Sequence, residues 1–141
     1  MSLSVYLSFN GNCEEVMNFY KDKIGAKVES IIRIEDVQGK CDGISDKEED
    51  KKKIIHAVMY INDTKLMCSD CRSDKAIIGD NFSLSFDFKN IDEIQRTFDA
   101  LSNNGGTVTM PIQDTFWNAK FGMCKDKFGI HWMFNYDKLK S

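Results

Sequence analysis

The chain has 141 residues, of which 42% are hydrophobic, so it is long enough for one domain or for two small modules that share a core. Its formal net charge of −3 provides no overall attraction to nucleic acid or to an anionic membrane. No apolar stretch approaches the length that spans a bilayer, and the first residues lack the basic segment of a secretion signal. We therefore expect a cytoplasmic protein without nucleic-acid or membrane partners, whose five cysteines stay reduced.

The first predicted elements are a strand and a helix. Apolar and polar residues alternate within Leu3–Phe9, the pattern of a strand with one buried face. The helix is expected to begin after Asn12, whose side chain would cap it together with Glu15 three residues later. Gly25 is expected to end it. The residues expected on its buried face are Val16, Phe19, Tyr20 and Ile24.

The same two elements recur in the second half of the chain. Phe82–Phe88 alternates in the same way as the first strand. The following helix is expected to end at Asn104-Gly105-Gly106. Its apolar residues stand at helical spacing, namely Ile91, Ile94, Phe98 and Leu101.

Three strand-like segments follow each helix, so the order βαβββ occurs twice. In the first half they are Lys27–Glu35, Ile54–Ile61 and Lys65–Ser69. In the second half they are Thr107–Gln113, Lys120–Lys125 and Ile130–Asn135. The turns are expected at residues 62–64 and 126–129, where Asn, Asp and Gly gather. This pattern predicts an α+β fold of two modules, about residues 1–74 and 80–141 of a single domain, which share a cleft.

The two halves differ mainly by the segment Gln38–Lys53. Acidic and basic residues nearly balance in it, so a solvated, mobile loop between two strands is expected. A lid over a binding site is the functional alternative, and a neutral insertion is the structural one.

Sequence strings near both ends resemble those of a known family. The first is Tyr6-Leu7-Ser8-Phe9-Asn10-Gly11-Asn12-Cys13-Glu14-Glu15, followed by Asn18-Phe19-Tyr20 and Gly25. The second is Phe116-Trp117 with Phe121-Gly122-Met123 and then Asp126-Lys127-Phe128-Gly129-Ile130-His131-Trp132-Met133. Both resemble PhnB-like proteins of the vicinal oxygen chelate superfamily, which includes glyoxalase I, bleomycin-resistance proteins and extradiol dioxygenases. The resemblance covers nearly the whole chain except residues 38–53.

The resemblance implies two βαβββ modules that form a glyoxalase-like curled mixed sheet around a central cleft, and a homodimer. Metal-using members of the superfamily place His, Glu or Gln ligands on the first and last strands of the modules. The matching positions here are Val5 or Tyr6, Met67, Ser83 and Met133. None of these is a histidine or a carboxylate, whereas a Lewis-acid metal requires such donors at about 2 Å. We therefore expect no usual metal site and no cofactor, with a divalent metal as the alternative.

Two histidines are candidates for the cleft. His56 is in phase with Val58 and Tyr60 on its predicted strand, and it could act there as an acid, a base or a ligand-binding group. A packed, hydrogen-bonded histidine is the structural alternative. His131 is in phase with Met133, although it stands next to a turn, where exposed histidines are common. A metal site would need both histidines and a carboxylate, for which Asp87 is the nearest candidate by phase.

Trp117 and the cysteines each allow a functional and a structural interpretation. Trp117, in a predicted loop, could form a stacking wall of the cleft or anchor the core. Cys68-Ser69-Asp70-Cys71 is a lone CxxC, which lacks the second pair that a zinc site uses. Cys13 stands at a helix start, but Glu14 and Glu15 oppose its ionisation. We interpret these cysteines as structural.

The residues expected to line the cleft are Tyr6, Ser8, His56, Met67, Ser83, Ser85, Asp87, Trp117, His131 and Met133. The leading hypothesis is a protein that binds an unidentified small molecule there, with His56 as the candidate for any catalytic role. One alternative is a metal-dependent lyase, isomerase or dioxygenase. Another is an antibiotic-sequestering protein, for which Asp87 would meet a cationic drug. A methyltransferase is not favoured, because no glycine-rich nucleotide loop is visible.

Overall fold

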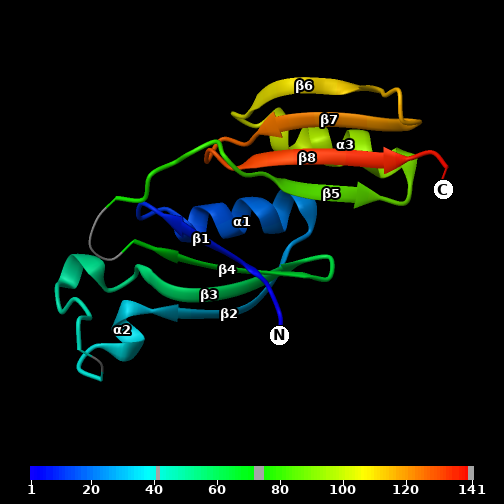
Figure 1. Cartoon of the computed structure of the whole chain (residues 1–141). Coiled ribbons are helices and arrows are strands. Elements are labelled where there is room, and N and C mark those ends of the chain that lie inside the picture. The colour runs from blue at the N-terminus through cyan, green and yellow to red at the C-terminus, as the bar shows by residue number, and fades with distance from the viewer. Residues whose placement is uncertain (41, 72–74, 140–141) are drawn as a thin grey trace. The chain divides into compact units, whose positions relative to one another are not determined.

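The computed structural model describes residues 1–40, 42–71 and 75–139. The chain folds as two compact units, Met1–Ile77 and Ile78–Ser141, and both have the predicted order of elements (Figure 1). Within the described ranges, no helix is long and apolar enough to cross a membrane.

The first unit has one helix packed on a four-stranded sheet. Its elements are β1 (Val5–Phe9), α1 (Cys13–Ile24), β2 (Lys27–Arg33), α2 (Ile34–Val37), the 3₁₀ helix η1 (Glu48–Asp50), β3 (Ile54–Ile61) and β4 (Thr64–Asp70). The strand order is β1-β4-β3-β2, in which β1 and β4 are parallel and the other pairs antiparallel.

The second unit repeats this arrangement without the two short helices. Its elements are β5 (Leu84–Phe88), α3 (Ile91–Ser102), β6 (Thr107–Asp114), β7 (Ala119–Lys125) and β8 (His131–Asp137). The order is β5-β8-β7-β6, again with only the first pair parallel among the described strands. The predicted α+β fold of two βαβββ modules is therefore confirmed.

The core of each unit lies between its long helix and one face of its sheet. In the first unit, Val16 and Tyr20 of α1 and Leu7 and Phe9 of β1 are at most 4% exposed. Ile24, which was expected on the same face, is half-buried, because it lies in the last turn of α1, where the helix ends at Gly25.

The second core is built mainly from aromatic rings. Phe86 stacks on Trp132 with ring centroids 5.2 Å apart, and Phe98 of α3 meets Phe134 edge-on, also at 5.2 Å. Such offset and edge contacts add to the hydrophobic gain from burial. Ile91, expected on the buried face of α3, is 42% exposed because it is the first residue of that helix.

Four predicted strand ends were wrong by two residues, and others by one; among the four is the end of β8, which runs to Asp137 rather than Asn135. β1 and β5 each begin two residues later than expected, at Val5 and Leu84, where pairing with β4 and β8 begins. Unpaired Leu3 is 99% exposed. β2 ends at Arg33 rather than Glu35, because α2 begins at Ile34, whose N–H donates to the Lys53 carbonyl at 3.0 Å.

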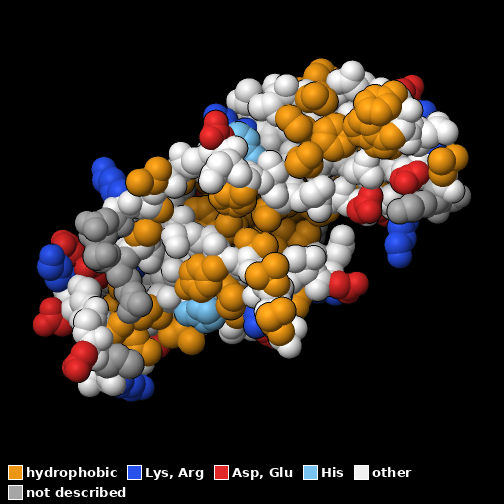
Figure 2. Space-filling model, viewed as in Figure 1, with side chains coloured by type: hydrophobic (Ala, Val, Ile, Leu, Met, Phe, Trp, Pro, Cys, Tyr) orange, Lys and Arg blue, Asp and Glu red, His pale blue; other side chains and the backbone are white. Residues whose placement is uncertain are grey.

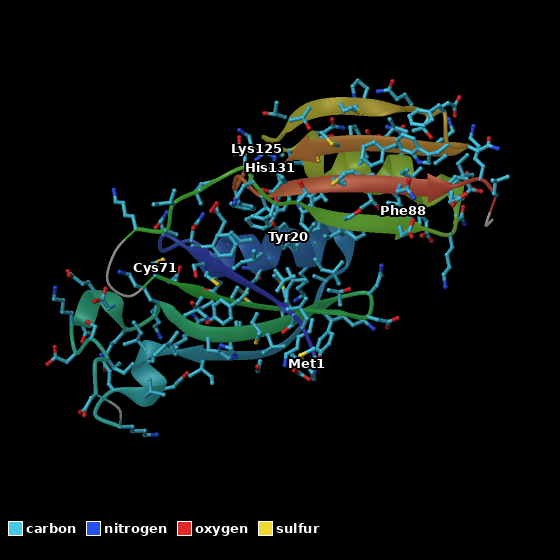
Figure 3. The ribbon with its side chains drawn as sticks, in the orientation of Figure 1. Met1, Tyr20, Cys71, Phe88, Lys125 and His131 are labelled. Carbon is cyan, nitrogen blue, oxygen red and sulfur yellow. The ribbon has the colours of Figure 1, made fainter. Side chains whose placement is uncertain are left out.

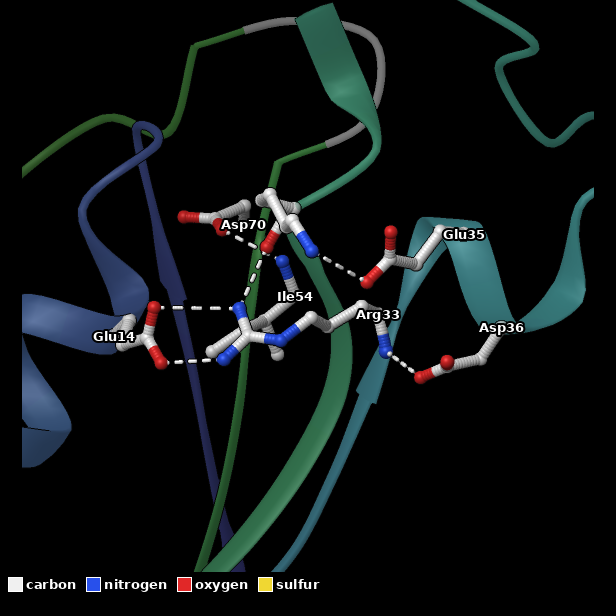
Figure 4. Close-up of polar contacts among 7 residues, drawn as sticks. Glu14, Arg33, Glu35, Asp36, Ile54 and Asp70 are labelled. Carbon is white, nitrogen blue, oxygen red and sulfur yellow. Dashed lines mark hydrogen bonds and ion pairs between the residues drawn. The ribbon is translucent and has the colours of Figure 1, made fainter. Parts of the chain in front are cut away.

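The predicted cap of α1 was also wrong. The Asn12 side chain makes no capping hydrogen bond. Instead the buried carboxylate of Asp70, at the end of β4, accepts the Cys13 N–H and the Ile54 N–H, both at 2.9 Å (Figure 4 shows the second). A carboxylate at a helix N-terminus also complements the helix dipole. One side chain thus joins the start of α1 to two strands.

Candidate functional site

The open face of the first sheet, opposite α1, brings together four of the predicted residues. Tyr6 pairs with Met67 across β1 and β4, and Met67 pairs with Val58 of β3. Because side chains alternate along a strand, Ser8 lies on the same face as Tyr6, and His56 on the same face as Val58. Tyr6 is 46% exposed, and His56 and Met67 are half-buried, so this face is accessible within its unit.

Tyr6 and His56 form the most specific contact on this face. The Tyr6 hydroxyl lies 3.3 Å from His56 Nδ1, and the two rings are 5.8 Å apart. If Nδ1 accepts from the hydroxyl, the imidazole proton resides on Nε2. Among the described residues no hydrogen bond to Nε2 is found, so this atom can serve an outside group. His56 is therefore hydrogen-bonded, as the structural alternative expects, and also accessible. Its role in binding or catalysis stays a prediction.

The open face of the second sheet carries a different set of groups. Ser85 pairs with Met133, and Asp87 pairs with Asn135, across β5 and β8. The Asn135 amide donates to the Asp87 carboxylate at 2.9 Å. Ser83 is exposed and precedes β5, so it is not part of the strand that was expected to present it.

Aromatic residues extend this second face at one end. Trp117 meets Phe116 edge-on at 4.9 Å and Phe121 at 6.0 Å. Phe116 is 97% and Trp117 49% exposed, and Figure 2 shows hydrophobic side chains gathered over β6 and β7. Trp117 therefore does not anchor the core of its unit. Its partly exposed ring is available for stacking on a flat or apolar molecule.

His131 does not meet Asp87. It pairs with Lys125, where β7 ends and β8 begins, and Figure 3 labels both residues at that end of the sheet. Asp87 instead lies beside Asn135, four residues further along β8, which corresponds to about 13 Å of extended strand. The pairing that a metal site in this unit would need is therefore absent from the described strands.

The donor atoms of neither unit fit a divalent metal. The positions matched to the superfamily ligands carry Tyr6, Met67, Ser83 and Met133, which offer no imidazole or carboxylate. In the described part of the chain, no group of three His, Cys, Asp or Glu side chains is arranged to hold a metal ion.

A salt-bridge network lies beside the start of α1 (Figure 4). The Arg33 guanidinium donates two hydrogen bonds to the Glu14 carboxylate and one to the Lys52 carbonyl, the last at 2.8 Å. The Arg33 backbone N–H donates to Asp36 at 2.8 Å. Hydrogen bonding to Arg33 lowers the pKa of Glu14. The network links α1 to the end of β2.

Sequence reasoning missed a pocket in the first unit. It has a volume of about 440 Å³ and its described lining contains none of the ten predicted cleft residues. Its walls include Ile34, Ser45, Lys47, Asp50 and Cys71. Asp50 accepts from Ser45 at 2.6 Å and pairs with Lys53 at 2.7 Å. The balanced charges of residues 38–53 suggested a solvated loop, with a lid as the functional alternative, and nothing in their spacing indicated a concave wall.

Comparison with known proteins places this arrangement in a family. Residues 2–134 match the glyoxalase/bleomycin resistance protein/dioxygenase superfamily. The chain belongs to this superfamily. It is also 34% identical to protein YjdN of Escherichia coli K12, over 98% of this chain and 97% of that protein.

Two solved structures agree with the fold. A PhnB protein from Bacillus cereus is similar with a TM-score of 0.78 and 26% identity, covering 96% of this chain and 99% of that one. Protein PA1353 of Pseudomonas aeruginosa gives 0.77 and 33%, covering 96% and 98%. The resemblance to PhnB-like proteins that the sequence indicated is therefore confirmed.

Proposed function

We propose that this superfamily member binds a small organic molecule on the open face of its first sheet, without a tightly held divalent metal. The observation that supports the proposal is the accessible hydrogen-bonded pair of Tyr6 and His56. A phenol and an imidazole can each donate or accept a hydrogen bond, so the pair can recognise one polar group of a ligand. Met67 offers an adaptable apolar contact beside it.

The open face of the second sheet is a separate candidate surface with different chemistry. Trp117 and Met133 suit an apolar or flat group, and Asp87 suits a donor. Its polar groups are already partly used, because Asp87 is hydrogen-bonded to Asn135 at 2.9 Å. We assign the polar recognition step to Tyr6 and His56 instead, because Nε2 of His56 remains available to an outside group although Nδ1 is already hydrogen-bonded to Tyr6.

A thermal-shift screen tests the proposal directly. The probes are small carboxylates, phosphates, phenols and aromatic amines, followed by calorimetry for each compound that raises the melting temperature. Tyr6→Phe and His56→Gln should each weaken a hit by about 5- to 10-fold, the loss expected for one net hydrogen bond. His131→Gln is the matched control in the other unit and should leave affinity unchanged. The proposal fails if no probe binds, or if the control weakens binding as much as His56→Gln.

Metal content separates this proposal from a metal-dependent lyase, isomerase or dioxygenase. Purified protein is treated with chelator, reloaded with zinc or nickel, and measured by elemental analysis and calorimetry. Weak or substoichiometric binding is expected, since the positions matched to the superfamily ligands lack suitable donors. Tight, stoichiometric binding that is lost in His56→Ala would favour the enzyme.

We also propose that the chain forms a homodimer, which the resemblance to PhnB-like proteins supports. Light scattering coupled to size-exclusion chromatography should report twice the mass of one chain. A monomer across micromolar concentrations would reject this part of the proposal and leave the binding proposal standing.

A further inference from the structure

Two cysteines lie together in the core of the first unit. Cys13 is the first residue of α1, and Cys68 lies on β4, on the face that α1 covers. Both are 0% exposed. Asp70 follows Cys68 by two residues on the same strand face, and its carboxylate holds the Cys13 N–H at 2.9 Å. This bond fixes the first turn of α1 over the part of β4 that carries Cys68.

The two thiols interact with each other. Their hydrogen bond raises the pKa of Cys13, as does burial, and it lowers the pKa of Cys68 against the opposing effect of burial. In this hydrogen bond Cys13 is the donor and Cys68 is the acceptor. A thiolate stabilised by a neighbouring thiol is the reactive form in dithiol chemistry.

We propose that Cys13 and Cys68 are a redox-active dithiol that a hydroperoxide converts into a disulfide. The Cys68 sulfur attacks the peroxide and breaks its O–O bond, which gives Cys68 sulfenic acid and releases an alcohol, or water when the oxidant is hydrogen peroxide. The Cys13 sulfur then attacks the Cys68 sulfur, forms the S–S bond and releases water. In total the thiols lose two electrons and two protons, and the hydroperoxide is reduced. The step does not depend on the proposed ligand site.

The remaining described cysteines provide internal comparisons. Cys71 is half-buried just beyond β4 and lines the pocket of the first unit, so it reports that the oxidant reaches this region. Cys124 is 1% exposed in the second unit, and burial raises its pKa to about 12. It has no hydrogen bond to a second thiol among the described residues. It is therefore the control for a buried cysteine that has no second thiol beside it.

The test treats the full, folded chain with hydrogen peroxide, blocks remaining thiols under denaturing conditions, and maps the peptides by mass spectrometry. The expected product is a Cys13–Cys68 linked pair that has lost two hydrogens and is restored by dithiothreitol. Because the bond constrains the unfolded chain, oxidised protein should melt about 5 °C higher than reduced protein. Cys124→Ala should form the bond at the wild-type rate, whereas Cys68→Ala should not form it.

Other outcomes overturn the proposal. It is rejected if Cys13 and Cys68 remain free thiols after exposure that oxidises Cys71. It is equally rejected if Cys68 links to Cys71 instead, or if the Cys13–Cys68 bond appears only after denaturation. Because mapping uses the wild-type chain, a folding defect in a cysteine variant does not affect these readings.

Discussion

The two units share a topology but connect helix to strand with different residues. In the first unit Gly25, in the left-handed region at φ 72°, precedes Ala26, which is 3% exposed. In the second unit Gly105 at φ 88° precedes Gly106. A Cβ at Gly106 would lie 2.6 Å from the Leu101 carbonyl oxygen and 2.7 Å from that of Lys125. The residue just before the strand therefore has room for a methyl group in one unit and none in the other.

The helix starts differ in the same manner. Asn90 caps α3 from the adjacent position by accepting the Asp92 N–H at 2.9 Å. In the first unit the cap is Asp70, which is far from α1 in the sequence and also binds a strand. In both units the first backbone N–H groups of the helix need a hydrogen-bond acceptor. A side chain adjacent in sequence supplies it in the second unit, and one distant in sequence supplies it in the first.

The largest effect on stability should come from adding a methyl group at Gly106, where the connection from helix to strand has no room for it. Gly106→Ala is expected to lower the free energy of unfolding by about 3 kcal/mol, because backbone oxygens surround the new methyl group and cannot move aside cheaply. Ala26→Gly, the reverse change in the other unit, should cost only about 1 kcal/mol. Urea unfolding followed by circular dichroism measures both. Similar costs for the two changes would mean that the connections are equivalent after all.

The second-largest effect is expected from the two helix caps, Asp70 and Asn90. Asp70→Asn is expected to cost about 2 kcal/mol, because an amide places a donor against one of two buried N–H groups. Asn90→Ala removes a single exposed cap and should cost about 1 kcal/mol. The same urea series compares them. A larger loss from Asn90→Ala would show that Asp70 is not the main cap of α1.

The smallest effect concerns Glu14 and Arg33. Their side chains are 50% and 23% exposed, so a double-mutant cycle with Glu14→Gln and Arg33→Gln should give a coupling of only about 0.5 kcal/mol at neutral pH. The pKa of Glu14 is lowered in the folded state. The coupling is therefore present above the unfolded pKa of about 4.3 and is lost as the pH falls through the folded value. Coupling that persists at pH 2 would contradict this pairing.

The repeated pattern of elements was predictable because it depends on local signals. The strand-like segment Ile54–Ile61 was predicted with both ends correct, and Gly25 ends α1 as expected. The starts of β1 and β5 were not predictable, since they depend on where the partner strand begins. The Asp70 cap was missed for the same reason, because no local spacing relates it to Cys13.

The candidate site was predictable only in part. Strand phase placed Tyr6, Ser8, Met67 and His56 on one face, because alternation depends on the strand alone. The contact between Tyr6 and His56 requires the order β1-β4-β3, which no local pattern specifies. Asp87 and His131 shared a phase but lie about 13 Å apart along the strands, a separation that only the register reveals.

The aromatic core of the second unit has a spectroscopic consequence. Both tryptophans of the chain belong to that unit, and Trp132 is stacked on Phe86 at 5.2 Å in its core. Intrinsic tryptophan emission therefore reports the second unit alone, whereas the far-ultraviolet dichroism signal reports both. If the units melt as one cooperative body, Asp70→Asn shifts both signals together. If they melt separately, that change in the first unit moves the dichroism transition and leaves the emission transition in place.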